Sequence, residues 1–290
     1  MYAAPFDYYR ATTLAEAHQL LKAHPDAKLL AGGHSLLPLM KLRLAQPAAV
    51  VDIGRLAELK GIAAQGDTLR IGALTTHAEL AASADVRRAV PLLAEAASMI
   101  GDPTIRNRGT IGGNVAHADP ASDLPTVLLA VGARFATAGP GGERTVDAKD
   151  FFQGLMTTAL KEDEVLTAIL VPALKKGEGS AYVKWAHPAS RYAVVGAAAI
   201  VAVGGGKISS ARVAVGGLVP HALRAAGVEA ALAGQAPTPD AIAKAAETLR
   251  ADLGDNLIGD VFASAEFRGR VAPVYAGRAI QTAATRAAKA

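Results

Sequence analysis

Two glycine-rich segments contain the residues of this 290-residue sequence that could bind a ligand. The first, Ala31-Gly-Gly-His-Ser35, follows a short apolar run, and the second is Gly109-Thr-Ile-Gly-Gly-Asn114. Paired glycines allow backbone amides to turn into one concavity, and Ser35 can begin a helix. Because such amides and helix starts attract phosphate, the two segments predict a pyrophosphate held between two subdomains.

Several alternative sites fail on spacing, although either segment alone could be a simple turn. Neither has the G-x-G-x-x-G turn and distal acid of a Rossmann site. Ser35 lacks the second glycine of a nucleophile elbow, so we expect it to cap a helix and bind a ligand. Gly204–Lys207 lacks the Ser/Thr of a P-loop and is predicted to be a hairpin turn. His117, Asp119 and Asp123 lie among prolines and fit a polar turn better than a metal site.

The composition excludes other classes. There is no cysteine, which removes disulfide scaffolds, thiolate zinc sites, iron–sulfur proteins and cysteine nucleophiles. The formal charge is only +4 and aromatic residues make up 4%, so we expect no nucleic-acid partner. The longest apolar run, Tyr192–Val203, is shorter than the roughly 18 residues of a membrane span, and Met1–Arg10 resembles no signal peptide. We therefore expect a soluble, cytoplasmic protein that does not cross a membrane.

Helix and strand signals surround the two segments. Thr13-Leu-Ala-Glu16 and Thr76-His-Ala-Glu79 are capping boxes that predict helix starts. Ser35 is predicted to cap a helix that runs to Lys41. Gly101–Pro125 is dense in turn formers, so the second segment is interpreted as a loop. The other predicted elements are strands over Lys28–Ala31, Val50–Ile53, Thr68–Thr75 and Val165–Val171, a helix over Pro91–Ile100, and a hairpin over Phe135–Val146.

The polar stretch Lys175–Gly179 is the best candidate for a domain boundary. Beyond it, strand patterns precede helical ones, which predicts an α+β domain with a meander sheet covered on one face. The predicted strands are Tyr182–His187, Val194–Val203 and Lys207–Val215, and the predicted helices are Arg224–Leu232, Pro239–Leu253 and Ser264 to the end.

The two segments and their neighbours resemble a known family. Ala31–Ser35 runs on into Leu36–Arg43, and Arg106–Asn114 is followed by Asp119-Pro-Ala-Ser-Asp123. In this order and spacing the motifs are similar to those of the FAD-binding medium subunit of molybdenum hydroxylases. This is the family of xanthine dehydrogenase and aerobic carbon monoxide dehydrogenase, and the resemblance covers nearly the whole chain.

The resemblance implies an α+β fold in two domains. Residues 1–176 would form a FAD-binding domain of the vanillyl-alcohol-oxidase (PCMH) type, with subdomains of about 1–55 and 56–176 that clasp the cofactor. Residues 177–290 would form a small α+β domain of the carbon monoxide dehydrogenase flavoprotein type, with a meander sheet and helices.

The resemblance also assigns residues to parts of FAD. Ala31–Ser35 and Thr110–Asn114 would hold the pyrophosphate. Asp123 would contact the ribose–adenine side, and Leu166 would lie in the strand beside the cofactor. Neither a catalytic residue nor a metal ligand is expected in this chain.

Two further residues are expected at the isoalloxazine ring. Lys184 matches a family lysine, and a cation there would stabilise negative charge on the reduced ring. Tyr192 would place an aromatic ring against the flavin. The full set of expected FAD-binding residues is Ala31, Gly32, Gly33, His34, Ser35, Leu36, Gly101, Thr110, Ile111, Gly112, Gly113, Asn114, Asp123, Leu166, Lys184 and Tyr192.

The resemblance implies an electron-transfer subunit of a heterotrimeric enzyme, assembled as a dimer of heterotrimers. A large partner subunit would oxidise the substrate at a molybdenum cofactor. A small partner subunit would pass the electrons through two [2Fe–2S] clusters to a non-covalently bound FAD in this chain, and from there to a quinone, NAD, oxygen or another carrier. Because this chain has no cysteine, it cannot hold those clusters itself.

Two alternatives remain open at this point. One is a stand-alone flavin oxidase of the same fold, with FAD attached covalently at His34. The other is a binding module that uses the same α/β shell without flavin. The substrate of the complex, whether carbon monoxide, a purine, another N-heterocycle or an aldehyde, is left open, as is the final electron acceptor.

Overall fold

The computed structural model describes residues 1–289, and the chain begins with a small parallel sheet. Strands β1 (Asp7–Arg10), β3 (Ala49–Asp52) and β2 (Lys28–Leu30) pair in that order, and both pairs are parallel. Parallel neighbours need crossover connections, which contain α1 (Leu14–Ala23) and α2 (Leu36–Lys41) here. The strands and helices predicted for this part are confirmed within one or two residues.

The middle of the chain forms a five-stranded antiparallel sheet in the order β4-β5-β10-β6-β7. The central strand β10 is almost wholly buried, and its sequence is apolar apart from Thr167. The β6–β7 hairpin turns where the sequence predicts it. The bounds are β4 Ile62–Gln65, β5 Thr68–Gly72, β6 Arg134–Gly139, β7 Gly142–Asp147 and β10 Val165–Pro172.

Six helices connect β5 to β6, and three of them begin in the region that is dense in turn formers. The interpretation of the second glycine-rich segment as a loop is wrong, because Gly112 and Gly113 lie in the first turn of α7. The Asp102 carboxylate and the Thr110 hydroxyl cap α6 and α7, so these polar residues start helices. The bounds are α3 His77–Ala82, α4 Ala84–Ala89, α5 Pro91–Met99, α6 Pro103–Arg106, α7 Ile111–His117 and α8 Asp123–Val131, and the shorter elements are η1 Ala57–Leu59, α9 Ala148–Phe151, β8 Phe152–Gly154 and β9 Thr157–Thr158.

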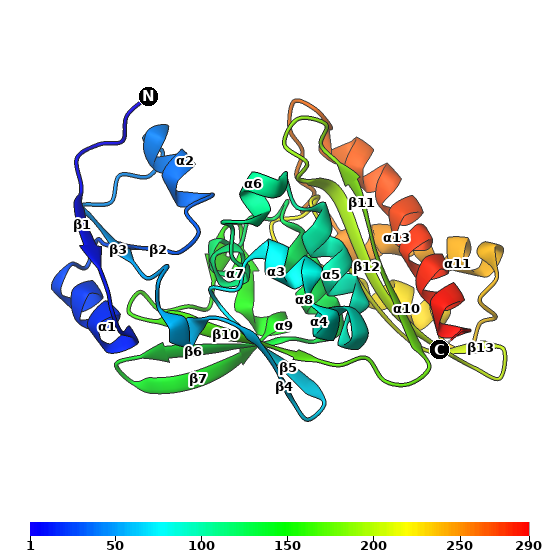
Figure 1. Ribbon diagram of the computed structural model, residues 1–290. Coiled ribbons are helices and arrows are strands. Elements are labelled where there is room, and N and C mark those ends of the chain that lie inside the picture. Colours follow the sequence, from blue (N-terminus) through cyan, green and yellow to red (C-terminus); the bar gives the residue numbers. More distant parts are fainter. Residues whose placement is uncertain (290) are drawn as a thin grey trace.

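The C-terminal part is a meander of strands, in the order β11-β12-β13-β14, followed by helices. Figure 1 shows α13 on one face of this sheet and the helices of the middle part, α5 and α8, on the other. Alternate residues of β12 therefore enter two cores: Ala198 and Ile200 join the core of the middle part, whereas Ala199 and Val201 face α13. The prediction that only one face of this sheet is covered is wrong. Both faces of β12 are buried, which explains its long apolar run.

Helix α13 lies very close to the sheet. A Cβ on Gly179 of β11 would overlap the Ala283 carbonyl of α13, and the helix presents alanines to the strands. The strand bounds are β11 Glu178–Ala186, β12 Ala193–Gly204, β13 Lys207–Gly216 and β14 Leu223–Arg224, and the helix bounds are α10 Ala226–Leu232, α11 Pro239–Ala246, α12 Leu249–Leu253 and α13 Ala265–Ala287.

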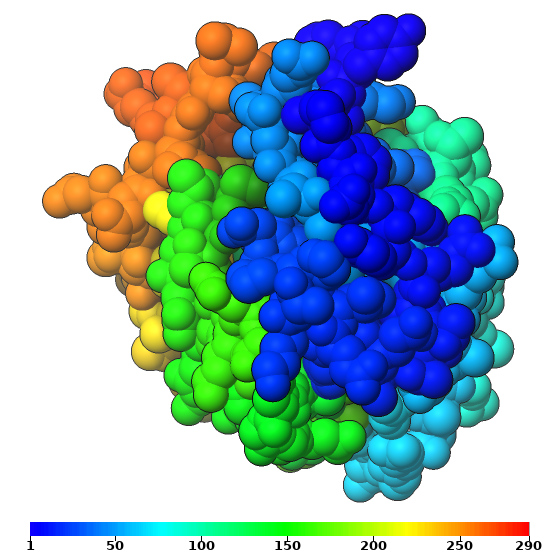
Figure 2. Space-filling model, turned by 90° about the vertical axis from the view of Figure 1, so that its left-hand side faces the viewer, coloured from blue at the N-terminus to red at the C-terminus, as the bar shows by residue number. Residues whose placement is uncertain are grey.

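The N-terminal part covers one side of the molecule. Figure 2 shows it in blue, beside the green middle part and, at the upper left, the orange segment that leads into α13. No helix among residues 1–289 is long and apolar enough to cross a membrane. The division of the chain at 176/177, and of the first part near residue 55, stays a prediction.

Candidate functional site

The first glycine-rich segment joins β2 to α2. Gly33 has a φ of 76°, a left-handed conformation that glycine adopts without strain. Gly32 lies so close to the Arg108 carbonyl that a Cβ would overlap it. Within residues 1–289, the amides from Gly32 to Ser35 donate no hydrogen bond. Successive amides of this kind can bind an anion.

The second segment begins helix α7. Thr110 is the N-cap, and its Oγ1 accepts a hydrogen bond from the Gly113 amide at 3.1 Å. The Gly112 amide donates to the Ala73 carbonyl at 2.8 Å. A Cβ on Gly112 would lie 2.5 Å from the Ala73 Cβ, so only glycine fits where α7 packs against the end of β5. The residues that the sequence singles out here form the start of a helix.

The two segments touch each other. Gly32 packs against Arg108 and against Gly109 of the second segment, since a Cβ on Gly32 would lie 3.0 Å from the Gly109 Cα. A β-bridge between Thr76 and Thr110 ties the second segment to the start of α3. The parallel sheet and the middle part of the chain thus meet at a shared backbone cradle, as the sequence predicts.

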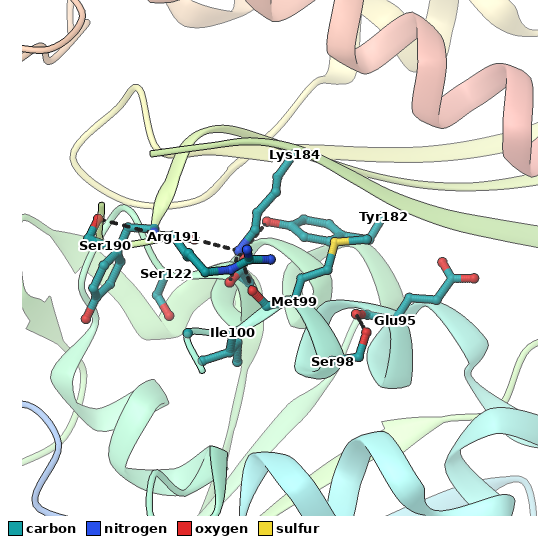
Figure 3. Close-up of polar contacts among 12 residues, drawn as sticks. Glu95, Ser98, Met99, Ile100, Ser122, Tyr182, Lys184, Ser190 and Arg191 are labelled. Carbon is teal, nitrogen blue, oxygen red and sulfur yellow. Dashed lines mark hydrogen bonds and ion pairs between the residues drawn. The ribbon is translucent and has the colours of Figure 1, made fainter. Parts of the chain in front are cut away.

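A buried ion pair lies behind another part of the cavity wall, and Figure 3 shows its lysine, Lys184, beside Tyr182. The Lys184 ammonium of β11 and the carboxylate of Asp123, the first residue of α8, lie 2.9 Å apart, with side chains 3% and 5% exposed. Tyr182, on the same face of β11, donates its hydroxyl to the other oxygen of Asp123 at 2.5 Å. Burial raises the pKa of Asp123, and the Lys184 charge and the Tyr182 hydroxyl oppose that rise.

The loop between β11 and β12 brings Tyr192 to the site. The Lys184 ammonium donates to the Arg191 carbonyl of this loop at 2.8 Å. Burial raises the pKa of the Tyr192 phenol, and the nearby Ser35 hydroxyl opposes the rise. Ser35 is the N-cap of α2, but the expected side-chain cap is wrong, because its hydroxyl accepts no hydrogen bond from the helix. Tyr192 therefore reaches from the C-terminal part to the first segment.

These parts enclose a cavity of about 640 Å³. Ligand sites typically measure roughly 300–1,000 Å³. Ile111 and Lys184 do not line it, since Ile111 is fully buried in the core and Lys184 lies behind Asp123. The expected residues that do line it are Ala31, Gly32, Gly33, His34, Ser35, Leu36, Gly101, Thr110, Gly112, Gly113, Asn114, Asp123, Leu166 and Tyr192.

One pair of assignments from the resemblance needs correction. Asp123 was expected at the ribose–adenine side of FAD, and Lys184 beside the isoalloxazine ring at the opposite end. The structure joins the two side chains in one ion pair. Two groups in contact cannot serve opposite ends of an extended dinucleotide, so both belong to the same end of the cavity.

His77 also lines the cavity, although it was not among the expected residues. Its ring lies against Gly109, where a Cβ would be 2.8 Å from the imidazole Cδ2. The side chain is buried, and Nδ1 has no hydrogen-bond partner among residues 1–289. Burial lowers the pKa of His77 to about 4, helped by the charges of His34 and Arg106. The capping box over Thr76–Glu79 is confirmed, but it gives no sign that its second residue faces a ligand.

These features fit a dinucleotide such as FAD. The unbonded amides from Gly32 to Ser35 suit a diphosphate, and Gly113 at the start of α7 is exposed beside them. The orphaned Nδ1 of His77 is a buried polar atom that a ligand or water could satisfy. The Tyr192 ring, 41% exposed, provides an aromatic surface for a flat ring system.

Comparison with known families agrees with this fit. Residues 4–174 match the family described as the FAD binding domain in molybdopterin dehydrogenase. Residues 180–283 match the CO dehydrogenase flavoprotein C-terminal domain. The first match contains both glycine-rich segments, and the second contains Lys184 and Tyr192.

Individual proteins are similar over nearly the whole chain. The carbon monoxide dehydrogenase medium chain of Hydrogenophaga pseudoflava is 43% identical over 286 residues, 98% of each chain. The nicotine 6-hydroxylase medium subunit of Paenarthrobacter nicotinovorans is 36% identical over 90% of this chain and 91% of its own. A solved structure of the Hydrogenophaga pseudoflava carbon monoxide dehydrogenase, which lacks the Mo-pyranopterin moiety, superposes with a TM-score of 0.94 at 44% identity, over 99% of both chains.

Proposed function

This chain belongs to the FAD-binding medium subunits of molybdenum hydroxylases, and we propose that it passes electrons from the [2Fe–2S] clusters of a partner subunit to an acceptor outside the complex. FAD, the cofactor of this family, supplies the capacity to take up and release one or two electrons. The observation that supports the proposal most strongly is the contact between the two glycine-rich segments, because it brings the unbonded amides from Gly32 to Ser35 close to the start of α7 beside the cavity.

The residues of this chain bind and orient the cofactor in our proposal. The amides from Gly32 to Ser35 hold the diphosphate, and the first turn of α7, whose own amides donate within the protein, lies against it. Leu166 of β10 contributes apolar surface, and Tyr192 packs against the flavin ring. Asp123 lies at that same end of the cavity because Lys184 ties it to the loop of Tyr192. None of these residues needs to act as a general acid or base.

The absence of cysteine in the whole sequence supports an external electron source. Iron–sulfur clusters of the [2Fe–2S] type need cysteine thiolates, and this chain has none. Electrons delivered by such clusters must therefore come from another polypeptide. We propose a small [2Fe–2S] subunit and a large subunit with the molybdenum cofactor, in a soluble, cytoplasmic dimer of heterotrimers.

We propose that the substrate is chosen outside this chain. The similar proteins are named for different substrates, carbon monoxide in one and nicotine in another, yet both are medium subunits. One flavoprotein architecture thus accompanies different oxidations, and neither substrate follows from the cavity described above.

Co-purification tests the proposal. The tagged chain, isolated from its own cells, is expected to bring down two further polypeptides together with FAD, iron and molybdenum. A Gly113→Glu variant places a carboxylate in the cradle and should lose FAD while it keeps its partners. Gly141→Glu is the matched control, because a Cβ there meets nothing within 4 Å. Flavin-free wild-type complexes would favour the binding module, and a lone yellow chain without iron would favour the oxidase.

The covalent alternative depends on His34, which is exposed at the cavity and whose Nδ1 lies 3.1 Å from the Gly32 carbonyl. Acid precipitation of the complex separates the two cases. We expect all of the FAD in the supernatant, as for non-covalent binding. Flavin that stays in the pellet of the wild type, but not of a His34→Gln variant, would establish the covalent link.

A further inference from the structure

We propose that Lys184 is a positioning residue of the FAD site, whose ammonium holds three separate segments of the cavity wall at one point. The inference rests on the proposed function, since it concerns the same cavity. It differs from the expectation that the ammonium acts on the flavin ring directly.

The hydrogen bonds of the ammonium support a positioning role. Lysine has three N–H donors. They go to the Asp123 carboxylate at 2.9 Å, the Met99 carbonyl at 3.0 Å and the Arg191 carbonyl at 2.8 Å. Figure 3 shows Lys184 pointing toward Met99 and Arg191. Every donor is used within the protein and the side chain is only 3% exposed, so no donor remains for a ligand.

Each acceptor belongs to a segment that lines the cavity. Met99 ends α5 and is followed by Ile100 and Gly101. Asp123 starts α8 and itself faces the cavity. Arg191 directly precedes Tyr192 and has a φ of 60°, a conformation that a residue with a Cβ rarely adopts. The ammonium thus joins two helix ends and a constrained loop that are distant in the sequence.

Neighbouring residues of the C-terminal sheet hold the Lys184 side chain in place. Tyr182 occupies the same face of β11 and bonds the second oxygen of Asp123. Gly196, opposite Lys184 in the neighbouring strand, leaves room for the Tyr182 hydroxyl, because a Cβ there would lie 2.6 Å away from it. The sheet therefore presents one cation and one hydroxyl to a single carboxylate, and the pair is neutral as a whole.

Paired variants of the complete complex test the inference. Lys184→Met removes the three bonds and leaves Asp123 buried and unpaired, so we expect the Kd for FAD to rise at least about tenfold. Lys184→Met/Asp123→Asn also removes the uncompensated charge, and its Kd should lie between those of the single variant and the wild type. Lys176→Met, at an exposed lysine, is the matched control and should change nothing.

The midpoint potential of the bound flavin separates positioning from direct action. In the double variant an ion pair is replaced by neutral groups, so positioning predicts an unchanged potential together with a weaker Kd. The double variant can be compared with the wild type even where the single variant Lys184→Met does not fold. A more negative potential in the double variant, or a wild-type Kd, would overturn the inference. Loss of FAD from the wild type and from Lys176→Met would instead contradict the proposed function.

Discussion

The two ends of the FAD site differ in what forms their walls, which is backbone at one end and paired side chains at the other. Around Gly32 and Gly112 the wall is backbone, and glycine is needed because neighbouring atoms occupy the place of a Cβ. Around Asp123 and Lys184 the wall is held by a buried ion pair between side chains from different parts of the chain. We therefore expect the two ends to be disrupted by different changes. An added side-chain atom should disrupt the first end, and loss of one charge of the ion pair should disrupt the second.

The largest expected effect comes from removing one charge of the pair. Asp123→Ala leaves the Lys184 ammonium buried without its counterion, and breaking a buried pair costs about 3–5 kcal/mol. Urea unfolding of the purified complex or chain measures this loss. Asp123→Leu/Lys184→Met removes both charges and should recover most of the stability. A double variant as unstable as Asp123→Ala would mean that the ion pair is not what holds this end.

A second effect concerns the protonation of His77 at the backbone end. The unfolded chain takes up a proton near pH 6.5, whereas the folded protein does so only near pH 4. Stability should be full above pH 6.5 and fall as the pH drops toward 4, by about 2 kcal/mol between pH 6.5 and pH 5 from this group.

The same urea titration at several pH values checks the assignment to His77. In His77→Gln this part of the pH dependence should vanish, whereas Lys184→Met/Asp123→Asn should retain it. Equal slopes in His77→Gln and the wild type would place the titrating group elsewhere.

A third effect adds one carbon atom to the backbone end. Gly32→Ala pushes a Cβ into the Arg108 carbonyl, and overpacking of this kind costs about 1–3 kcal/mol. Because the same contact joins the two glycine-rich segments, FAD content should fall with it. Gly141→Ala, at an open position, should retain both stability and flavin. A Gly32→Ala protein with full flavin would show that the segments need not touch.

The smallest expected effect tests the cap of α7. Thr110→Ala removes the acceptor for the Gly113 amide, a loss of about 1 kcal/mol for a helix N-cap. Thermal unfolding should show a small decrease in Tm, and Thr110→Ser should restore it because the hydroxyl remains. A Thr110→Ser protein as unstable as Thr110→Ala would indicate that the threonine methyl group, not the cap, matters.

The two ends also differ in how far the sequence predicts them. The glycine-rich segments and the Thr76–Glu79 capping box are local patterns. They are predictable because such residues determine the geometry of the backbone around them. The helical start at Thr110 was missed because glycines disfavour helix interiors, and here packing against Ala73 overrides that preference. The sequence also predicts correctly that Ser35 begins α2. Its prediction of a cap by the Ser35 hydroxyl is wrong, because that hydroxyl accepts no hydrogen bond from a helix amide.

The ion-pair end depends on contacts between distant residues. Asp123 and Lys184 lie 61 residues apart, and nothing near either one indicates the other. Their pairing follows from the C-terminal sheet packing on α5 and α8, which is a tertiary fact. The same holds for His77, whose burial is set by Gly109 on another segment. The longer strands and the helices with clear caps or apolar periods were nevertheless predictable, because those signals are local.

The most direct test of the site is the electron density of FAD in crystals of the complete complex. We predict that the diphosphate lies against the amides from Gly32 to Ser35 and the start of α7, with the flavin ring at the end where Tyr192 and Asp123 meet. A diphosphate bound away from both glycine-rich segments, or an adenine ring at the Tyr192 end, would contradict it.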